Sequence, residues 1–211
     1  VAGLEDATEG EILVDGQRVN DLEPKDRDVA MVFQSYALYP NMNVYENIRF
    51  PLKVRGVDPK THDKKVKRAS AMVELDDFLH RKPAELSGGQ RQRVALARAV
   101  VREPNLFLMD EPLSALDSQT RDLLMEDFVN LWSRNPFTAI YVTHNLSEAV
   151  RLGHKVAVLS RRPGKIRDMI EIKKPIVDRG LVDRDLDDYQ RHLWGIMHDE
   201  ARAADAELLD V

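Results

Sequence analysis

The 211-residue chain has no cysteine, no long apolar run and no excess of basic residues. Without cysteine it can form no disulfide, no thiolate metal site and no cysteine nucleophile, which fits a cytoplasmic setting. No apolar stretch approaches the roughly 20 residues of a membrane-spanning helix, and the first residues lack the features of a signal peptide. The formal net charge of −5 argues against a general nucleic-acid binder. If this protein serves a membrane, we expect it to do so through a partner.

The composition that remains is ordinary for a globular protein. Hydrophobic residues make up 43% and charged residues 32% of the sequence. A chain of this length can bury a full core as one domain, or as one domain with a subdomain. We find no internal repeat and no low-complexity segment.

The N-terminal part begins with predicted β-structure and continues through an apolar stretch. The segment EILVDGQRV (11–19) places Asp15-Gly16 between two short apolar segments, which predicts a hairpin. VAMVF (29–33) predicts a buried strand. Residues 34–56 mix aromatic residues, asparagine and proline without a sustained period, so we expect a structured loop with short helical pieces. Residues 59–79 have the composition of an exposed helix.

Beyond residue 87, helical segments alternate with apolar strands. This alternation indicates βαβ crossovers and a parallel sheet with helices on it. Active groups in such sheets lie beyond the carboxyl ends of the strands. The predicted helices cover 87–103 and 117–134 and resume at 146, and the predicted strands cover 105–110, 138–143 and 155–160.

The C-terminal part predicts one more strand and a terminal helix. Residues 166–172 are expected to close an edge of the sheet. In the tail, apolar residues recur at three- and four-residue spacing, which predicts an amphipathic helix that packs against its own domain or, less commonly, against a partner. These residues are Leu186, Tyr189, Leu193, Met197 and Ala201.

The most distinctive segment is LSGGQ (86–90), at the start of a basic helix. Ser87 and Gln90 have the spacing of a capping box, in which the serine caps the helix and the glutamine reaches back to the serine amide. Gly88 and Gly89 have no Cβ, so another molecule can approach the first-turn amides, which favour phosphate. An ordinary capped helix with a solvated arginine face explains the stretch equally well.

Two carboxylates, Asp110 and Glu111, follow the apolar strand LFLM. The first can hold Mg²⁺, which proteins usually bind through one or two carboxylates together with phosphates. The second can act on a water molecule. An acidic pair at the end of a strand is also often a turn or a helix cap.

Three further polar residues lie beside the predicted strands and helices. Gln34 ends the strand at 29–33, where it is either an edge polar group or a ligand of metal and water. His144 follows the strand at 138–143 and, taken alone, is more simply a satisfied core histidine. Asp117 is most simply the N-cap of the next helix.

Taken together and in order, these motifs resemble the ATP-binding cassette of ABC transporters. The resemblance extends over residues 1–172 and implies an α/β fold with a P-loop NTPase-like, mostly parallel sheet flanked by helices. It also implies a small antiparallel β subdomain and a helical subdomain, at about 35–103, that carries the signature motif. Residues 173–211 would form a C-terminal extension. The motifs are FQ (33–34), LSGGQ (86–90), LFLMDEP (106–112), SALD (114–117) and TH (143–144).

The resemblance implies ATP and Mg²⁺ as cofactors. Ser87, Gly88, Gly89 and Gln90 would be the signature motif, and Asp117 would be the D-loop aspartate at the seam of a cassette dimer.

Four residues would form the catalytic and metal-binding set in this resemblance. Asp110 corresponds to the Walker B carboxylate on the Mg²⁺ shell, and Glu111 to the general base for water. Gln34 corresponds to the Q-loop residue that touches Mg²⁺ and the attacking water, and His144 to the switch histidine that contacts the γ-phosphate. The implied hydrolysis depends mainly on positioning and electrostatic stabilisation, with general-base assistance.

The family also needs a phosphate loop, G-x-x-x-x-G-K-[ST], and the 211 residues contain none. In the family this loop shortly precedes a segment like VAGLEDATEGEI (1–12), so we expect the sequence to be part of a longer ATPase. Family cassettes pair head to tail, and the signature helix of one chain closes over ATP held by the other. The alternative is a catalytically silent or truncated cassette that lends only its signature helix and permease contacts to an active partner.

The resemblance further implies a peripheral protein on the cytoplasmic face of the plasma membrane. Its partners would be a second cassette of like or unlike kind, transmembrane permease subunits and a solute-binding protein, with no nucleic acid. The apolar stretch at 34–56 would form the groove that receives the permease. This stretch and the acidic charge weigh against an ABC ATPase that acts on DNA or ribosomes.

The two halves of the sequence favour different cargo. Residues 24–56 look most like the cassettes of carbohydrate importers, whereas residues 143–166 and the tail look more like those of nitrate, sulfonate and taurine importers. Only about forty residues follow the cassette, too few for the regulatory barrel that carbohydrate importers usually carry. The tail therefore favours the oxyanion and sulfonate class slightly.

Overall fold

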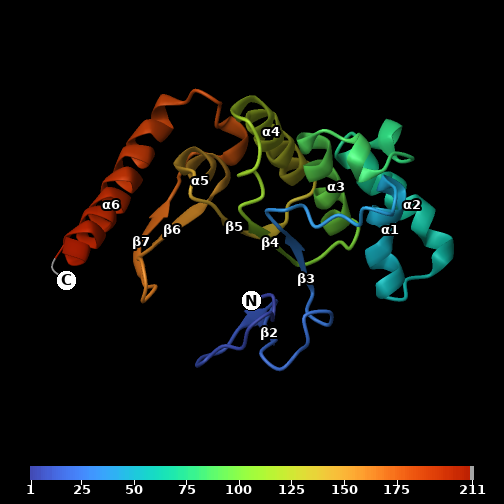
Figure 1. Ribbon diagram of the computed structural model, residues 1–211, viewed down its shortest axis with the longest axis horizontal. Helices are drawn as coiled ribbons and strands as arrows, with labels where there is room; N and C mark the ends of the chain where they lie inside the picture. The colour runs from blue at the N-terminus through green and yellow to red at the C-terminus, as the bar shows by residue number, and fades with distance from the viewer. Residues whose placement is uncertain (210–211) are drawn as a thin grey trace. The chain divides into compact units, whose positions relative to one another are not determined.

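The computed structural model describes the backbone of residues 1–209 and the side chains of residues 1–198 (Figure 1). Its contacts divide the chain into two compact units. The first contains residues 1–127 and 131–142, and the second contains residues 128–130 and 143–211. Helix α4 (Ser118–Arg134) contributes residues to both units.

The first unit opens with the predicted hairpin. Strands β1 (Leu13–Val14) and β2 (Gln17–Arg18) pair antiparallel around a two-residue turn. Asp15 and Gly16 in that turn have φ angles of 51° and 76°. Two positive φ angles give a turn whose twist matches the strands, which is why Asp-Gly is favoured there. The hairpin prediction is confirmed.

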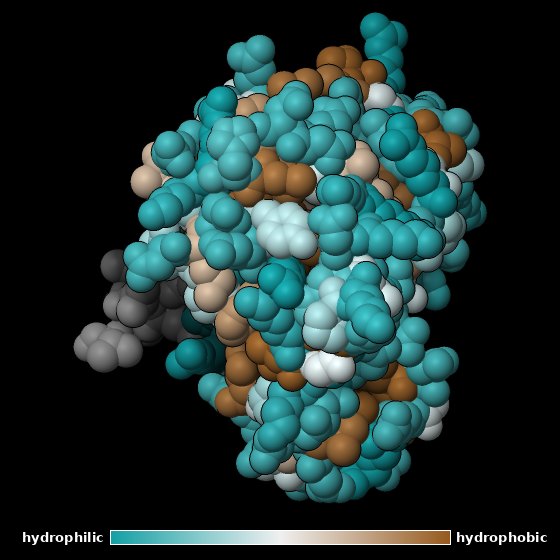
Figure 2. Space-filling view, turned by 90° about the vertical axis from the view of Figure 1, so that its right-hand side faces the viewer, coloured by the Kyte–Doolittle hydropathy of each residue, from teal (hydrophilic) through white to brown (hydrophobic). Residues whose placement is uncertain are grey.

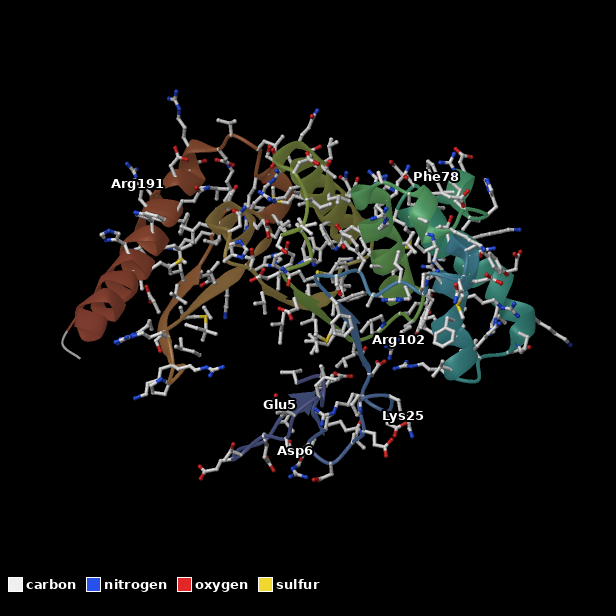
Figure 3. The ribbon with its side chains drawn as sticks, in the orientation of Figure 1. Glu5, Asp6, Lys25, Phe78, Arg102 and Arg191 are labelled. Atoms are coloured by element: carbon white, nitrogen blue, oxygen red, sulfur yellow. The ribbon has the colours of Figure 1, made fainter. Side chains whose placement is uncertain are left out.

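The main sheet of the first unit is parallel, with the order β3-β4-β5. Its strands are β3 (Val29–Val32), β4 (Leu106–Asp110) and β5 (Thr138–Val142), so the parallel arrangement is confirmed for these three. The charged residues Glu5, Asp6 and Lys25 are exposed near the hairpin (Figure 3). A buried apolar cluster joins the hairpin to the sheet through Val14, Val19, Val29, Leu106 and Leu108.

The connection from β3 to β4 is helical. Helix α1 contacts both α2 and α3 (Figure 1). Helix α2 was expected to extend to residue 79, but it ends at Met72 and a 3₁₀ turn follows. In order, the elements are α1 (Val44–Val54), α2 (Pro59–Met72), η1 (Asp76–Phe78), η2 (Pro83–Glu85) and α3 (Gly88–Val100).

Helix α1 corrects the expectation that residues 34–56 form a loop with only short helical pieces. It has 11 residues and begins with a capping box between Asn43 and Glu46. It buries Val44, Ile48 and Leu52, which follow one another at a spacing of four and so lie on one face. The N-x-x-E spacing was the local signal for this helix. The Pro51 inside it, together with the mixed composition, obscured the period.

The second unit combines a two-stranded sheet with helices. Strands β6 and β7 pair antiparallel, and in the described residues each has only the other as its strand partner. The elements are α5 (Leu146–Leu152), β6 (Lys155–Leu159), β7 (Ile166–Glu171), η3 (Ile176–Asp178) and α6 (Arg184–Leu209).

This pairing corrects two expectations, that residues 155–160 join the parallel sheet and that residues 166–172 close its edge. The chain between β6 and β7 covers only residues 160–165. A parallel neighbour needs a crossover of a dozen or more residues, whereas a short connection returns the chain antiparallel. The short connection therefore determines the direction of β7.

The predicted tail helix is present as α6 and packs within its own unit. Leu186 and Leu193 join a buried cluster with Val150, Val158 and Ile172, and Tyr189 packs against it. Met197 is 38% exposed, and the side chain of Ala201 lies outside the described residues. Of the described helices, none has the length and apolar character needed to cross a membrane. On the face in Figure 2, hydrophobic side chains form separate patches among hydrophilic ones.

Candidate functional site

Helix α3 begins at Gly88 with Ser87 as its N-cap. The Ser87 N–H donates to Gln90 Oε1 at 2.9 Å, and the Gln90 N–H donates to Ser87 Oγ at 3.2 Å. Both bonds of the predicted capping box are therefore present. Ser87 is exposed, so the positive end of the helix dipole lies at the surface.

Gly88 and Gly89 lie where side chains of the same chain approach closely. A Cβ on Gly89 would stand 2.8 Å from Thr120 Cγ2, and a Cβ on Gly88 would stand 3.2 Å from Leu116 Cδ2. The two glycines therefore let the start of α3 pack against the turn that leads into α4. This requirement does not follow from the two glycines alone, which indicate only that another molecule can approach the amides.

Asp117 is the N-cap of α4, as predicted. Its carboxylate accepts a bond from the Thr120 N–H at 2.9 Å and another from Thr120 Oγ1 at 2.7 Å. These backbone and side-chain hydrogen bonds from Thr120 lower the pKa of Asp117 below its usual value. Thr120 therefore contacts both the cap of α4 and the position of Gly89. Nothing in the sequence indicates that Thr120 lies where the starts of α3 and α4 meet.

Asp110 and Glu111 lie at the carboxyl edge of the parallel sheet. Asp110 is exposed at the end of an otherwise buried β4 and pairs in register with Val142. Glu111 has a φ of 44°, in the left-handed region that side chains of its size rarely adopt. Its N–H donates to the Val142 carbonyl at 2.9 Å, and its own carbonyl accepts from Ser114 Oγ at 2.9 Å. The structure therefore holds a strained backbone at the predicted general base, and such strain clusters at functional sites.

Gln34 leaves the sheet at the same edge as Asp110, because β3 and β4 are parallel neighbours in register. The residue is exposed. The loop after it contains Tyr36, whose hydroxyl lies 3.7 Å from where a Cβ on Gly88 would stand. Burial raises the pKa of this hydroxyl. The loop therefore reaches the start of α3, a contact that nothing in the sequence indicated.

His144 belongs to the second unit, where its residue is exposed. The neighbouring Thr143 Oγ1 donates to Glu148 Oε2 at 2.8 Å and accepts from the Asn145 N–H at 3.0 Å. Asn145 Oδ1 accepts from the Ser147 N–H at 2.9 Å and so caps α5. These bonds order the segment that carries His144.

The described residues contain no group of three or more His, Cys, Asp or Glu side chains that could hold a metal ion. The predicted donors, Asp110 and Gln34, instead provide a carboxylate and an amide oxygen. This donor set fits a hard cation such as Mg²⁺, which takes one or two protein oxygens and completes its shell with phosphate and water.

Comparison with known proteins identifies the family and the fold. Residues 1–114 match the family model described as ABC transporter. The chain belongs to the ABC transporter family. Its fold is similar to the ATP-binding cassette MJ0796 in a dimeric post-hydrolysis state bound to ADP and Pi, with a TM-score of 0.68 and 31% identity. That match covers 82% of this chain and 78% of the cassette, and it confirms the predicted α/β class.

Two curated relatives are named as ATP-binding proteins of transport or import. The multiple sugar-binding transport ATP-binding protein MsmK of Streptococcus mutans is 53% identical over 76% of this chain and 42% of its own length. The sn-glycerol-3-phosphate import ATP-binding protein UgpC of Burkholderia thailandensis is 53% identical over 76% of this chain and 45% of its own length. The chain therefore spans less than half the length of these relatives.

Within this ABC transporter chain, the first unit holds every predicted site residue except His144. The structure packs the predicted signature motif, Ser87–Gln90, against the turn that ends at Asp117, the predicted D-loop residue. It places Gln34 and Asp110 at one edge of the sheet, and Glu111 directly follows Asp110. His144 lies in the other unit, so its part in the same site stays a prediction.

Proposed function

We propose that this chain is the ATP-binding and ATP-hydrolysing part of an ABC importer. The observation that carries the proposal is the arrangement of the first unit. The capped start of α3 packs through its glycines on the turn at Asp117, and Asp110 and Glu111 lie at the carboxyl edge of the parallel sheet. In open α/β sheets, ligands bind at this edge.

The start of α3 is suited to phosphate. Its first amides and the positive end of its dipole favour negative charge, and Ser87 adds a hydroxyl at the same end. The 211 residues contain no G-x-x-x-x-G-K-[ST] motif, so we propose that α3 contacts a nucleotide whose phosphates are also held by a phosphate loop from outside these residues. The dimeric state of the similar cassette MJ0796 supports a second cassette as the partner.

Hydrolysis would use the groups at the sheet edge. Asp110 and Gln34 would hold Mg²⁺, which when bound neutralises charge on the phosphates. Glu111 would accept the proton of the attacking water, and the left-handed backbone fixes its position after β4. His144 would contact the γ-phosphate.

Permease subunits in the membrane, and a solute-binding protein, are the other proposed partners. Relatives named as transport and import ATP-binding proteins support the permease. We therefore propose peripheral association with the cytoplasmic face of the membrane. The names of these relatives favour carbohydrate or polyol-phosphate cargo over the oxyanion class that the tail suggested.

The substitution Glu111→Gln tests the catalytic assignment, with Glu5→Gln as its control. Both remove one carboxylate, and Glu5 is exposed near the hairpin. In the full-length protein assembled with its permease, we expect Glu111→Gln to lower the kcat for ATP by about 10²- to 10⁴-fold and to retain ATP in a cassette dimer. Glu5→Gln should leave turnover unchanged.

The alternative function is a silent cassette that only supplies its signature helix to an active partner. The expected result then differs, because Glu111→Gln would leave turnover at the wild-type rate. Substituting Ser87 would still reduce it, since the partner's nucleotide would lose its lid. This pair of results would overturn the catalytic proposal and establish the silent one.

A further inference from the structure

The loop after Gln34 has an unusual backbone. Tyr36 and Ala37 are consecutive and have φ angles of 61° and 47°. The left-handed region is unfavourable for residues that carry a Cβ, and a run of two without glycine persists only when its surroundings enforce it. Local bonds from the Tyr36 N–H to the Phe33 carbonyl, at 3.1 Å, and from the Ala37 N–H to the Ser35 carbonyl, at 2.7 Å, close the turn.

The side chain of Arg98, on α3, binds two backbone carbonyls of this turn. Its Nη1 donates to the Ala37 carbonyl at 2.5 Å, and its Nη2 donates to the Tyr36 carbonyl at 3.1 Å. The guanidinium also lies 5.7 Å from the ring centroid of Tyr39. Burial lowers the pKa of Arg98. A planar group with two parallel donors matches two successive carbonyls, which the point charge of a lysine does not.

The same loop also contacts the other end of α3. The Tyr36 hydroxyl lies close to Gly88, about three helical turns from Arg98. The loop is therefore held against α3 both at the phosphate-facing start of the helix and near its end. A displacement of α3 would be transmitted to the backbone that directly follows Gln34.

We propose that Arg98 is a positioning residue that fixes the Gln34 loop to helix α3. It keeps two left-handed residues in place and so makes the loop and the signature helix move as one body. The proposal rests on the proposed function for its effect on ATP turnover, but its structural part does not. Its hydrogen bonds go to the carbonyls of Tyr36 and Ala37, so it acts through the loop.

The first test measures amide hydrogen exchange in the full-length protein without nucleotide. Arg98→Ala should speed exchange at residues 34–42 by about tenfold or more, because charged hydrogen bonds to two carbonyls are lost. Arg98→Lys should give an intermediate increase. Arg93→Lys is the matched control, since Arg93 lies on the same helix but pairs with Glu74 and Asp127 instead. Exchange in β4 should not change in any variant.

The second test measures ATP turnover in the assembled transporter. Arg98→Ala should lower kcat by about tenfold while KM for ATP stays within about threefold, because the contact positions a loop rather than the nucleotide. Adding Ala37→Gly should restore part of the kcat, since glycine adopts the left-handed conformation without strain. If Arg98 only filled space, Arg98→Ala would leave a cavity that Ala37→Gly cannot fill, and kcat would not recover.

Two results would overturn the proposal. One is wild-type exchange at residues 34–42 in Arg98→Ala. The other is a loss of protection in β4 equal to that in the loop, with no rescue by Ala37→Gly. If the wild-type transporter showed no ATP turnover, the proposed function would fail, and the exchange result would still decide whether Arg98 holds the loop.

Discussion

Arg179 is expected to hold the second unit together. Arg179 is 4% exposed, and its Nη1 lies within hydrogen-bond distance of three carbonyls near the end of the seven-residue helix α5. Burial lowers the pKa of Arg179, but an arginine stays charged at any ordinary pH. The acceptors are the carbonyls of Val150 at 2.9 Å, Arg151 at 3.2 Å, Gly153 at 2.7 Å, Lys174 at 2.8 Å and Ile172 at 3.3 Å.

Arg179→Met should remove these bonds and keep most of the side-chain length. A hydrogen bond to a charged group contributes about 1.5–3 kcal/mol, but such contributions are not additive and the buried charge itself is costly. We therefore expect the free energy of unfolding of the second unit to fall by about 3–5 kcal/mol. Arg179→Lys should lower the free energy of unfolding by nearly as much, since a single ammonium group cannot reach all the carbonyls that the guanidinium binds.

Urea unfolding followed by Trp194 fluorescence, with hydrogen exchange at α5, measures this loss. Arg191→Met is the control, because Arg191 is exposed on α6 (Figure 3). It should change the free energy of unfolding by less than about 0.5 kcal/mol. A change of under about 1 kcal/mol in Arg179→Met would refute the inference that these carbonyls depend on Arg179.

Two further predictions concern the starts of α3 and α4. Gly89→Ala should lower the free energy of unfolding by about 1–3 kcal/mol, because its Cβ would stand 2.8 Å from Thr120 Cγ2. Combining it with Thr120→Ser, which lacks that methyl group, should recover most of the loss. No recovery would contradict the clash. Asp117→Ala should lower the melting temperature at pH 7, as measured by circular dichroism. The pKa of Asp117 is lowered on folding, so its contribution to stability is present above the unfolded pKa and is lost as pH falls through the folded pKa. The difference in melting temperature between variant and wild type should therefore disappear in strong acid. A difference that persists there would contradict the role of the charged cap.

The features that could be predicted from sequence are those set by local chemistry. The Asp15-Gly16 turn and the caps at Ser87, Asp117 and Asn145 each depend on residues a few positions apart, and all four are present. Strand β4 was predictable because four buried apolar residues precede a carboxylate.

What could not be predicted depends on residues distant in sequence or on backbone conformation. The pairing of β6 with β7 follows from a short connection that the apolar pattern alone does not reveal. The left-handed backbone at Glu111 and Ala37 has no marker, because neither residue is a glycine. The close approach of Thr120 to Gly89 joins two separate motifs, and no spacing rule within either one indicates it.

Strand β5 has a consequence for handling the protein. In the described residues it has a strand neighbour on one side only, and its Ile140 and Val142 are 46% and 51% exposed. An apolar edge strand is a template for pairing with another chain. Where no strand covers this edge, concentrated preparations should therefore self-associate through β5.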